Sequence, residues 1–205
     1  MQNKDELLLK IKNEVVALKE GELALLRGQT KMFPVLGEGS HAAKIMFVGE
    51  APGKNEAATG KPFCGASGRV LTQMIEHVGM KREDVYITNI VKDRPPENRD
   101  PLPEEIALYA PFLDRQIDII QPKVIATLGR YSMAYIMNKF GLAHELFDTA
   151  QSRLKTISQI HGKMFSAKAS YGPVKIITLY HPAVALYNGG KREELLKDFE
   201  IVKSI

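Results

Sequence analysis

The hydrophobic residues of this chain fall into short continuous runs that alternate with stretches of helical spacing. Four runs are apolar over almost their whole length, as expected for strands with both faces covered. They are "AKIMFVGE" at 43–50, "DVYITNIV" at 84–91, "KVIATLG" at 123–129 and "VKIITLYHP" at 174–182. The length and pattern of these runs predict four buried strands.

Apolar residues recur at helical spacing in the segments around these runs. The spacing predicts helices over 5–19, 68–79, 103–120, from about 131, and over 191–205. Strands that alternate with helices favour a parallel sheet covered by helices on both sides. Residues 145–170 give no clear assignment, and residues 161–167 within them fit either an extra strand or part of a long loop.

The loops that follow the four strands are expected to line one cleft, because ligands bind beyond the carboxyl ends of parallel strands. Their sequences are "GEAPG", "TNIVKDRPPENR", "GR" and "YHPA". These loops and their flanks collect a set of side chains suited to binding and catalysis: Glu50, Glu56, Phe63, Asn89, Asn98 and His181.

Each residue type in this set has a chemical use in such a cleft. The carboxylates of Glu50 and Glu56 can position or polarise water. The Phe63 ring can stack on a flat heterocycle, and the Asn89 amide offers a donor beside an acceptor, which matches the edge of a base. His181 can stabilise a developing anion. The set predicts a site for a planar heterocyclic ligand.

Every one of these residues also has a structural interpretation. Carboxylates cap helices or remain solvated, Phe63 can belong to the core, Asn89 can cap a turn, and His181 can pair with a backbone carbonyl. We interpret the other histidines as structural or exposed: His41, His77, His144 and His161.

The glycine-rich loop after the first strand does not have the spacing of a nucleotide phosphate loop. Only three residues separate Gly49 from Gly53, where a phosphate loop needs four. The later pair Gly60-Lys61 is followed by Pro62, which has no hydroxyl for magnesium. A nucleoside triphosphate site is therefore excluded.

The length and charge of the chain set its broad class. We expect a single domain over 1–205, of which 1–29 form an N-terminal helical segment. Lys and Arg number 28 against 24 Asp and Glu, and this net charge of +4 permits a polyanionic partner without requiring one. Basic residues around the cleft loops could follow a phosphate backbone: Lys61, Arg69, Lys92, Arg94, Arg99, Lys191 and Arg192.

Cys64 is the only cysteine, so neither an internal disulfide nor a cysteine-ligated metal cluster can form. This composition suits a reducing compartment. The charged, amphipathic N-terminus is unlike a signal peptide, and no segment approaches the roughly twenty apolar residues that a membrane span needs. We expect a cytoplasmic protein that uses no metal and contacts no membrane.

Several unusual motifs recur in order and identify a family resemblance. "GEAPGKNEAATGKPFCGASGRVL", "VYITNIVKDRPPENRDPLPEEI", "KVIATLG" and "HPA" resemble the family 4 uracil-DNA glycosylases, over about residues 30 to 202. The resemblance implies an α/β fold, a three-layer α/β/α sandwich around a central four-stranded parallel sheet. It also implies hydrolysis of the N-glycosidic bond of uracil in DNA, single- or double-stranded, by a monomer.

The resemblance assigns roles that agree with the chemistry of the residues. It places Glu50 beside the sugar and the water, together with the backbone of Ala51, Pro52 and Gly53. It implies that Phe63 stacks on the extruded uracil, that Asn89 reads the uracil edge, and that His181 faces uracil O2.

Further roles concern the second acidic position and the DNA. The resemblance implies that Glu56 pairs with Asn98, and that the loop "HPAVALYNGG" presses into the duplex, with Leu186 or Tyr187 as the wedge.

The chain also departs from the family pattern. The family usually has four cysteines that hold a [4Fe–4S] cluster, and the aligned positions here carry Glu22, Leu25, Asp93 and Tyr109. These side chains cannot replace a thiolate ligand set, so the cluster is predicted to be absent. Ala57 stands where an acidic residue commonly follows Glu56, and Cys64 stands where valine is usual.

The leading hypothesis is a monofunctional glycosylase for uracil in DNA, which flips the nucleotide out of the helix. One alternative is a glycosylase for another modified pyrimidine. The other is a catalytically inactive DNA-binding or replication accessory module of the same fold, as Ala57 and the missing cysteines would allow. The retained polar set at the strand ends favours an active enzyme.

Overall fold

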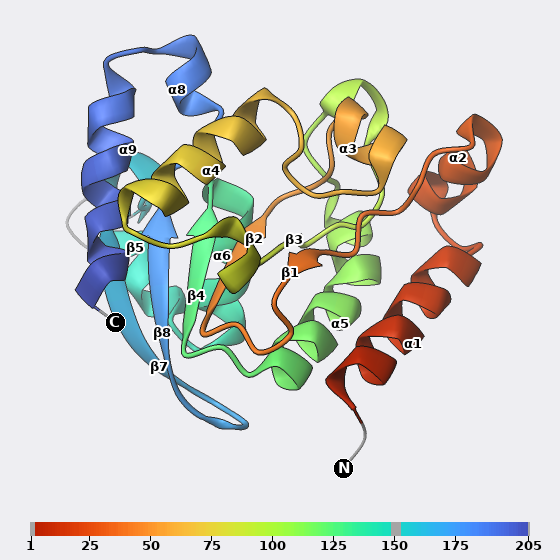
Figure 1. Cartoon of the computed structure of the whole chain (residues 1–205), viewed down its shortest axis with the longest axis horizontal. Coiled ribbons are helices and arrows are strands. Elements are labelled where there is room, and N and C mark those ends of the chain that lie inside the picture. Colours follow the sequence, from red (N-terminus) through yellow and green to blue (C-terminus); the bar gives the residue numbers. More distant parts are fainter. Residues whose placement is uncertain (1–2, 149–152, 205) are drawn as a thin grey trace.

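A six-stranded sheet forms the centre of the computed structural model, which describes residues 3–148 and 153–204 (Figure 1). Its strand order is β1-β3-β2-β4-β8-β7. The strands are β1 (Glu38–Gly39), β2 (Ile45–Gly49), β3 (Tyr86–Asn89), β4 (Val124–Leu128), β7 (Lys163–Ala169) and β8 (Gly172–Leu179). A two-stranded ribbon, β5 (Phe147–Asp148) with β6 (Arg153–Leu154), lies outside it.

The four central strands are the four that the apolar runs predict, and all of them are parallel. The expected four-stranded parallel sheet is therefore confirmed as the core of a larger one. The two edge strands are antiparallel additions, β1 against β3 and β7 against β8. Residues 163–169, for which the sequence left strand or loop open, form a strand whose burial alternates along its length, as expected at an edge.

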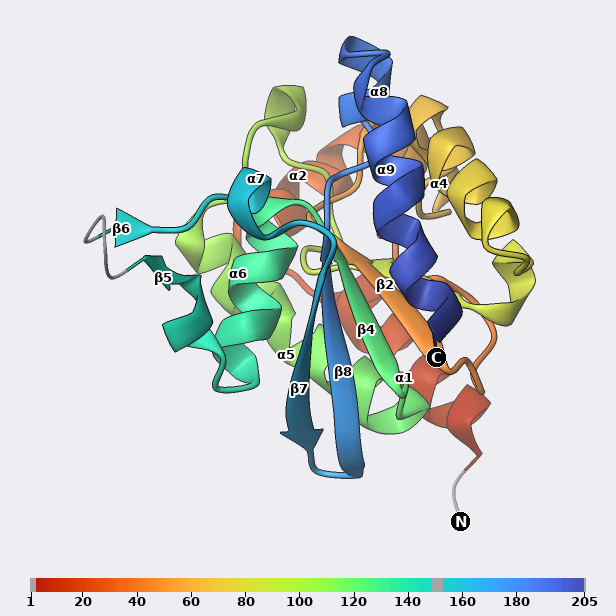
Figure 2. The ribbon, with the colours of Figure 1, turned by 90° about the vertical axis from the view of Figure 1, so that its left-hand side faces the viewer.

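Helices cover both faces of this sheet (Figure 2). One layer contains α1 (Lys4–Ala17), α5 (Pro103–Ile120) and α6 (Arg130–Lys139), and the opposite layer contains α4 (Ala66–His77) and α9 (Lys191–Phe199). The shorter helices are α2 (Glu22–Thr30), α3 (Lys54–Thr59), α7 (Ile157–Ile160) and α8 (Val184–Tyr187). The α/β/α layering expected from the sequence is confirmed. No helix in the described ranges has the length and apolar composition to cross a bilayer.

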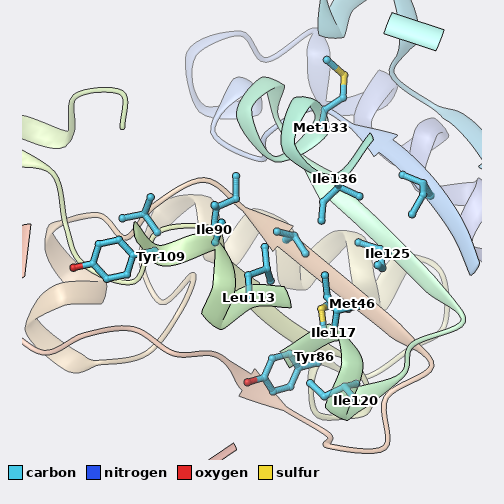
Figure 3. Packing of buried hydrophobic residues seen from close by; sticks show 14 of the residues in the cluster. Met46, Tyr86, Ile90, Tyr109, Leu113, Ile117, Ile120, Ile125, Met133 and Ile136 are labelled. Atoms are coloured by element: carbon cyan, nitrogen blue, oxygen red, sulfur yellow. The ribbon is translucent and has the colours of Figure 1, made fainter. Parts of the chain in front are cut away.

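The parallel strands are apolar throughout because their side chains supply two separate cores. On β2, Met46 and Val48 join the core beneath α1, α5 and α6, whereas Ile45 and Phe47 join the core beneath α4 and α9. Figure 3 shows Met46 in the first core, close to Ile117 of α5. Burial on both faces accounts for the absence of polar alternation in these runs.

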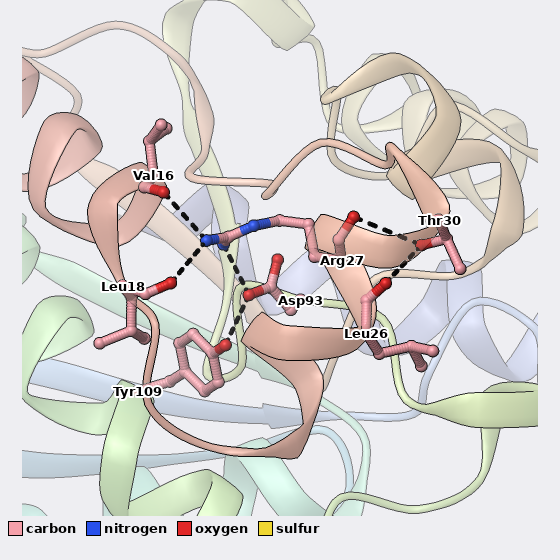
Figure 4. A network of polar contacts seen from close by, with 7 residues as sticks. All are labelled: Val16, Leu18, Leu26, Arg27, Thr30, Asp93 and Tyr109. Carbon is pink, nitrogen blue, oxygen red and sulfur yellow. Dashed lines mark hydrogen bonds and ion pairs between the residues drawn. The ribbon is translucent and has the colours of Figure 1, made fainter.

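A polar network joins α2 to the loop after β3 and to α5 (Figure 4). Arg27 Nη1 lies 2.7 Å from Asp93 Oδ2, and the Tyr109 hydroxyl donates to the same oxygen at 2.5 Å. Arg27 Nη2 also donates to the carbonyl oxygens of Val16 and Leu18, at 3.1 Å each. Burial raises the pKa of Asp93, and the hydrogen bonds from Tyr109 and Arg27 act in the opposite direction. The network therefore ties three separate segments together through one carboxylate.

We expect Arg27→Met to lower the free energy of unfolding by about 3 kcal/mol or more, because it leaves the buried Asp93 carboxylate without its cation. Arg115→Met is the matched control, since Arg115 pairs with Glu14 at a half-exposed position where a pair contributes about 1 kcal/mol or less. Urea unfolding of both variants at pH 7 measures the difference. Equal losses would contradict the proposed contribution of the network.

Candidate active site

The loops that follow β2, β3 and β8 line one cleft of about 520 Å³, whereas the loop "GR" after β4, which was also expected there, contributes no lining residue. The lining of the cleft includes Glu56 of α3 and Tyr187 of α8, two helices that lie beyond the same end of the sheet (Figure 1). Nine residues predicted for catalysis or substrate binding line it: Glu50, Ala51, Pro52, Gly53, Glu56, Phe63, Asn89, Asn98 and His181. The structure thus brings together residues that are up to 131 positions apart in sequence, since 181 minus 50 is 131.

The floor of the cleft is formed where β2 and β3 end side by side. Gly49 and Asn89 are direct partners in the parallel register. A side chain at Gly49 would overlap Asn89 Oδ1, and its Cβ would lie 2.8 Å from the Phe63 ring. The missing side chain therefore lets the amide and the ring converge on the same space. Asn89 Oδ1 is buried and has no hydrogen-bond partner among the described residues, which leaves it free to accept from a ligand.

Phe63 takes an unusual backbone conformation to present its ring to the cleft. Its φ is 47°, a left-handed value that is rare outside glycine. A side chain at Gly68 would overlap the Phe63 carbonyl, so the glycine permits this conformation. Arg82 holds the preceding residue by donating to the Pro62 carbonyl at 2.7 Å. The Phe63 ring lies 5.6 Å from the His181 ring, between centroids.

His181 lies in the loop after β8, and its ring nitrogen Nδ1 faces the backbone of that loop. The backbone N–H of Ala183 donates to Nδ1 at 3.2 Å. Nδ1 is therefore the acceptor, and in the neutral ring the proton is on Nε2. Burial lowers the pKa of His181 to about 4, and the charge of Glu56 only partly opposes this. The ring is neutral at pH 7 and donates through Nε2. The alternative structural interpretation, in which His181 pairs with a backbone carbonyl, is wrong, because the backbone partner of Nδ1 is an N–H group.

Glu50 has a carboxyl group that titrates near neutrality. Burial raises its pKa to about 7, Asp100 adds to the rise, and Arg130 opposes it. Arg130 forms an ion pair with Asp100. Sequence reasoning assigned no role to Asp100 or Arg130, although "GR" at the end of the third strand marked the position of Arg130. Both modify the pKa of Glu50, whose rise is caused mainly by burial.

The expected pairing of Glu56 with Asn98 is not made in this structure. Glu56 Oε1 instead accepts a hydrogen bond from the backbone N–H of Gly65 at 3.1 Å, and Asn98 Oδ1 accepts from Arg94 Nε at 2.7 Å. Asn98 has a φ of 55°, so the loop carries backbone strain where it borders the cleft. The side chain of Glu56 is buried, so its carboxylate faces other protein atoms rather than bulk solvent.

The basic residues predicted to contact DNA divide into three groups. Lys61 and Arg69 are exposed and line a second hollow of about 370 Å³, which shares Phe63 with the cleft. Several others already have acidic or amide partners, Arg99 with Glu105, Lys191 with Glu194, Arg192 with Gln73 and Arg94 with Asn98.

The prediction that Lys92 contacts DNA is wrong. Its side chain is fully buried, at 0% exposure, and cannot reach a phosphate. Its burial could not be predicted from residue type, because a lysine in a polar loop after a strand is usually solvated. The candidate wedge residues on α8 are exposed, Leu186 at 48% and Tyr187 at 88%.

The four positions aligned with cluster cysteines do not fit an iron–sulfur cluster. Asp93 and Tyr109 are hydrogen-bonded to each other, and Leu25 is exposed. The only cysteine, Cys64, is exposed and lines the second hollow instead. No group of three or more His, Cys, Asp or Glu side chains in 3–148 and 153–204 is arranged to hold a metal ion.

A mostly parallel sheet between two helix layers, with a polar cleft at the carboxyl ends of its strands and no phosphate loop, defines an α/β protein with an open ligand site. The family model described as the uracil DNA glycosylase superfamily matches residues 36–200. The chain is 46% identical to the type-4 uracil-DNA glycosylase of Sulfurisphaera tokodaii, over 97% of this chain and 84% of that protein. It is 45% identical to the type-4 enzyme of Archaeoglobus fulgidus, over 84% and 81% of the two chains. The chain therefore belongs to the type-4 group of the uracil DNA glycosylase superfamily.

Proposed function

We propose that this chain is a uracil-DNA glycosylase, which hydrolyses the bond between uracil and deoxyribose in DNA. The observation that carries the proposal is the unpartnered amide oxygen of Asn89 in a cleft beside an aromatic ring and a neutral histidine. The similarity to type-4 uracil-DNA glycosylases over nearly the whole chain supports the same activity.

The cleft offers a complementary surface to each part of uracil. The base has an N3–H donor beside the O4 acceptor, and the Asn89 amide can meet both with its oxygen and its nitrogen. The Phe63 ring can stack on the face of the base. The His181 Nε2–H can donate to O2, where negative charge develops as the base leaves. A neutral donor suits this step, because it stabilises the anion without being a strong acid.

Bond cleavage needs a negative charge near the sugar and a water molecule. The C1′–N1 bond breaks, its electron pair passes to the base, and the sugar becomes an oxocarbenium-like cation. The Glu50 carboxylate stabilises this cation and takes a proton from the water that adds to C1′. A pKa of about 7 suits Glu50 to taking the proton, because it makes the carboxylate a base that works at neutral pH.

The DNA strand would reach the cleft with its target nucleotide flipped out, at an unstacking cost of a few kcal/mol. Exposed Lys61 and Arg69 lie beside the cleft, and exposed Leu186 and Tyr187 stand on α8 as the wedge. We propose that Arg94, Arg99, Lys191 and Arg192 exchange their present partners for phosphates. We also propose that the protein acts as a monomer and as one domain, on single- or double-stranded DNA.

Incubation of the purified protein with a uracil-containing oligonucleotide, followed by hot alkali, tests the proposed function. Alkali breaks the strand at the abasic site that excision leaves. Matched oligonucleotides with thymine, cytosine and other modified pyrimidines distinguish a uracil enzyme from one with a different base preference. An intact uracil strand after prolonged incubation would contradict the proposal.

The pH dependence of excision reports the ionisation of Glu50. We expect kcat/KM to rise as pH increases through about 7, because the carboxylate form is the active one and its pKa is raised to about 7. In Glu50→Gln this rise of kcat/KM with pH should disappear, along with most of the activity. Asp100→Asn should move the rise to lower pH, since Asp100 raises the pKa of Glu50. If kcat/KM of Asp100→Asn rises over the same pH range as that of the wild type, the rise does not report the ionisation of Glu50.

We propose that the protein needs neither a metal ion nor an iron–sulfur cluster. The support is that, at two positions of family cysteines, Asp93 accepts hydrogen bonds from Tyr109 and from Arg27. Purified protein should be colourless and should retain full excision activity in EDTA. Stoichiometric iron with a visible charge-transfer band, or loss of activity on chelation, would refute the proposal.

A further inference from the structure

Lys92 is a fully buried lysine directly behind the base-reading residue. It follows β3, and its side chain folds back along the strand into the interior. Its Nζ lies 2.6 Å from the backbone oxygen of Asn89, 2.9 Å from Thr88 Oγ1 and 2.7 Å from Gln116 Oε1. The three N–H groups of an ammonium therefore meet three oxygens.

The oxygens around Nζ favour the charged form of the lysine. The Asn89 carbonyl and Gln116 Oε1 can only accept, and the Thr88 hydroxyl donates to the Leu36 carbonyl at 2.6 Å. A neutral amine would have two N–H groups and would turn its lone pair toward a third oxygen. Burial lowers the pKa of Lys92 to about 7, whereas three accepting oxygens act in the opposite direction.

No carboxylate neutralises this group in the part of the chain that the structure describes. The polar atoms around it come from Thr88, Gln116, the Asn89 backbone and, through Gln116, the Tyr86 hydroxyl. Burial of an ammonium without a counter-ion lowers the free energy of unfolding. Its field is also weakly screened, since little water surrounds it. Asn89, whose backbone oxygen accepts a hydrogen bond from Lys92 Nζ, lines the cleft.

We propose that Lys92 is a positioning residue for Asn89: it holds the Asn89 backbone at the floor of the cleft and supplies positive charge behind the amide that reads uracil. The inference rests on the proposed role of Asn89. A positive charge here favours the transition state over the ground state, because uracil is neutral when bound and anionic as it leaves. The cost of burying the charge in the free protein is thereby offset at the moment of bond cleavage.

Lys92→Met tests the proposal, because methionine fills similar space without charge or donors. We expect single-turnover excision of uracil to fall about tenfold, less than for a group that touches the base. The affinity for uncleaved DNA should stay within about twofold of the wild type. Thr127→Val is the matched control, since it removes a buried threonine hydroxyl of β4 that donates to the Ile177 carbonyl and has no bond to Nζ in the described residues. It should retain most of the activity.

The leaving base provides a readout that a purely structural role would not move. Fluorine at C5 withdraws electrons and makes 5-fluorouracil a better leaving group, so it depends less on external stabilisation. The loss in Lys92→Met should therefore be smaller for 5-fluorouracil than for uracil. General destabilisation would lower both rates by the same factor. A displaced Asn89 is distinguished by the double variant Asn89→Ala/Lys92→Met, because only charge behind the base slows excision further when Asn89 is already absent.

Gln116→Glu tests the charge with Lys92 in place, and it decides the matter if Lys92→Met fails to fold. It puts a carboxylate where Oε1 now lies 2.7 Å from Nζ, which cancels the net charge behind Asn89. We expect a similar tenfold loss of uracil excision. Activity within twofold of the wild type in either folded variant overturns the proposal. Wild-type protein that releases no uracil contradicts the proposed function itself, whereas equal activity of wild type and Lys92→Met contradicts only the role of Lys92.

Discussion

We expect Asn89→Ala to slow uracil excision by about three orders of magnitude, the largest loss of any single substitution in the cleft. Asn89 Oδ1 has no partner among the described residues, so its hydrogen bond is available only to a ligand. Alanine removes both the acceptor for N3–H and the donor for O4. The cleft then neither selects the base nor supports the charge that develops on O4.

Base selection follows from the same amide. Cytosine has an acceptor at N3 and an amino donor at C4, so both groups of Asn89 would face like partners in the cleft. Asn89→Asp should lose uracil activity, because a carboxylate repels O4, and its protonated form should gain weak activity on cytosine. Single-turnover excision from matched uracil and cytosine oligonucleotides measures both effects.

Asn138→Ala, at an exposed position on α6, serves as the control for the Asn89 variants. It should retain wild-type rates on uracil and inactivity on cytosine. If Asn89→Ala excised uracil at the wild-type rate and still spared cytosine, the base would be read by another residue.

The second large effect is expected for His181→Ala, which should lower single-turnover excision about a hundredfold. The affinity for DNA should change little, because the donor acts on charge that appears only during cleavage. Burial keeps the pKa of His181 near 4. Histidine ionisation should therefore add no limb to the pH profile between pH 5 and 8.

His144→Ala is the control, since this ring is exposed and does not line the cleft. His181→Gln should recover part of the lost rate, because its amide can still donate to O2. A His181→Ala variant that excises uracil nearly as fast as the wild type would remove His181 from the mechanism.

The central strands and the cleft could be predicted from the sequence because their signals are local. A run such as "KIMFVG" is short and wholly apolar, so it specifies a strand buried on both faces. The rule that ligands bind at the carboxyl ends of parallel strands then brings Glu50, Asn89 and His181 to one edge. The edge strand β7 was harder to predict, because its burial alternates and its sequence lacks a continuous apolar run.

The partners of individual polar side chains could not be predicted from the sequence. Lys92 is buried because Gln116, 24 residues away on α5, supplies an oxygen for its ammonium. Arg27 meets Asp93 across 66 residues. The pairing expected for Glu56 and Asn98 is not made, because residues nearer in sequence, Gly65 and Arg94, are the hydrogen-bond partners of their side-chain oxygens. Residue type alone does not specify such partners, because each depends on how the helices and loops pack around the sheet.

The order of the strands also bears on when the enzyme can first act during its synthesis. Glu50 and Asn89 follow β2 and β3, which emerge early, whereas His181 follows β8, which pairs with β4 across about 50 residues. A ribosome that has released only the first 128 residues holds a chain without the strand that completes the parallel sheet. Such a nascent chain has the amide that we propose reads the base but not the histidine that we propose stabilises the anion. These proposed roles imply that the chain is inactive until β8 has joined the sheet.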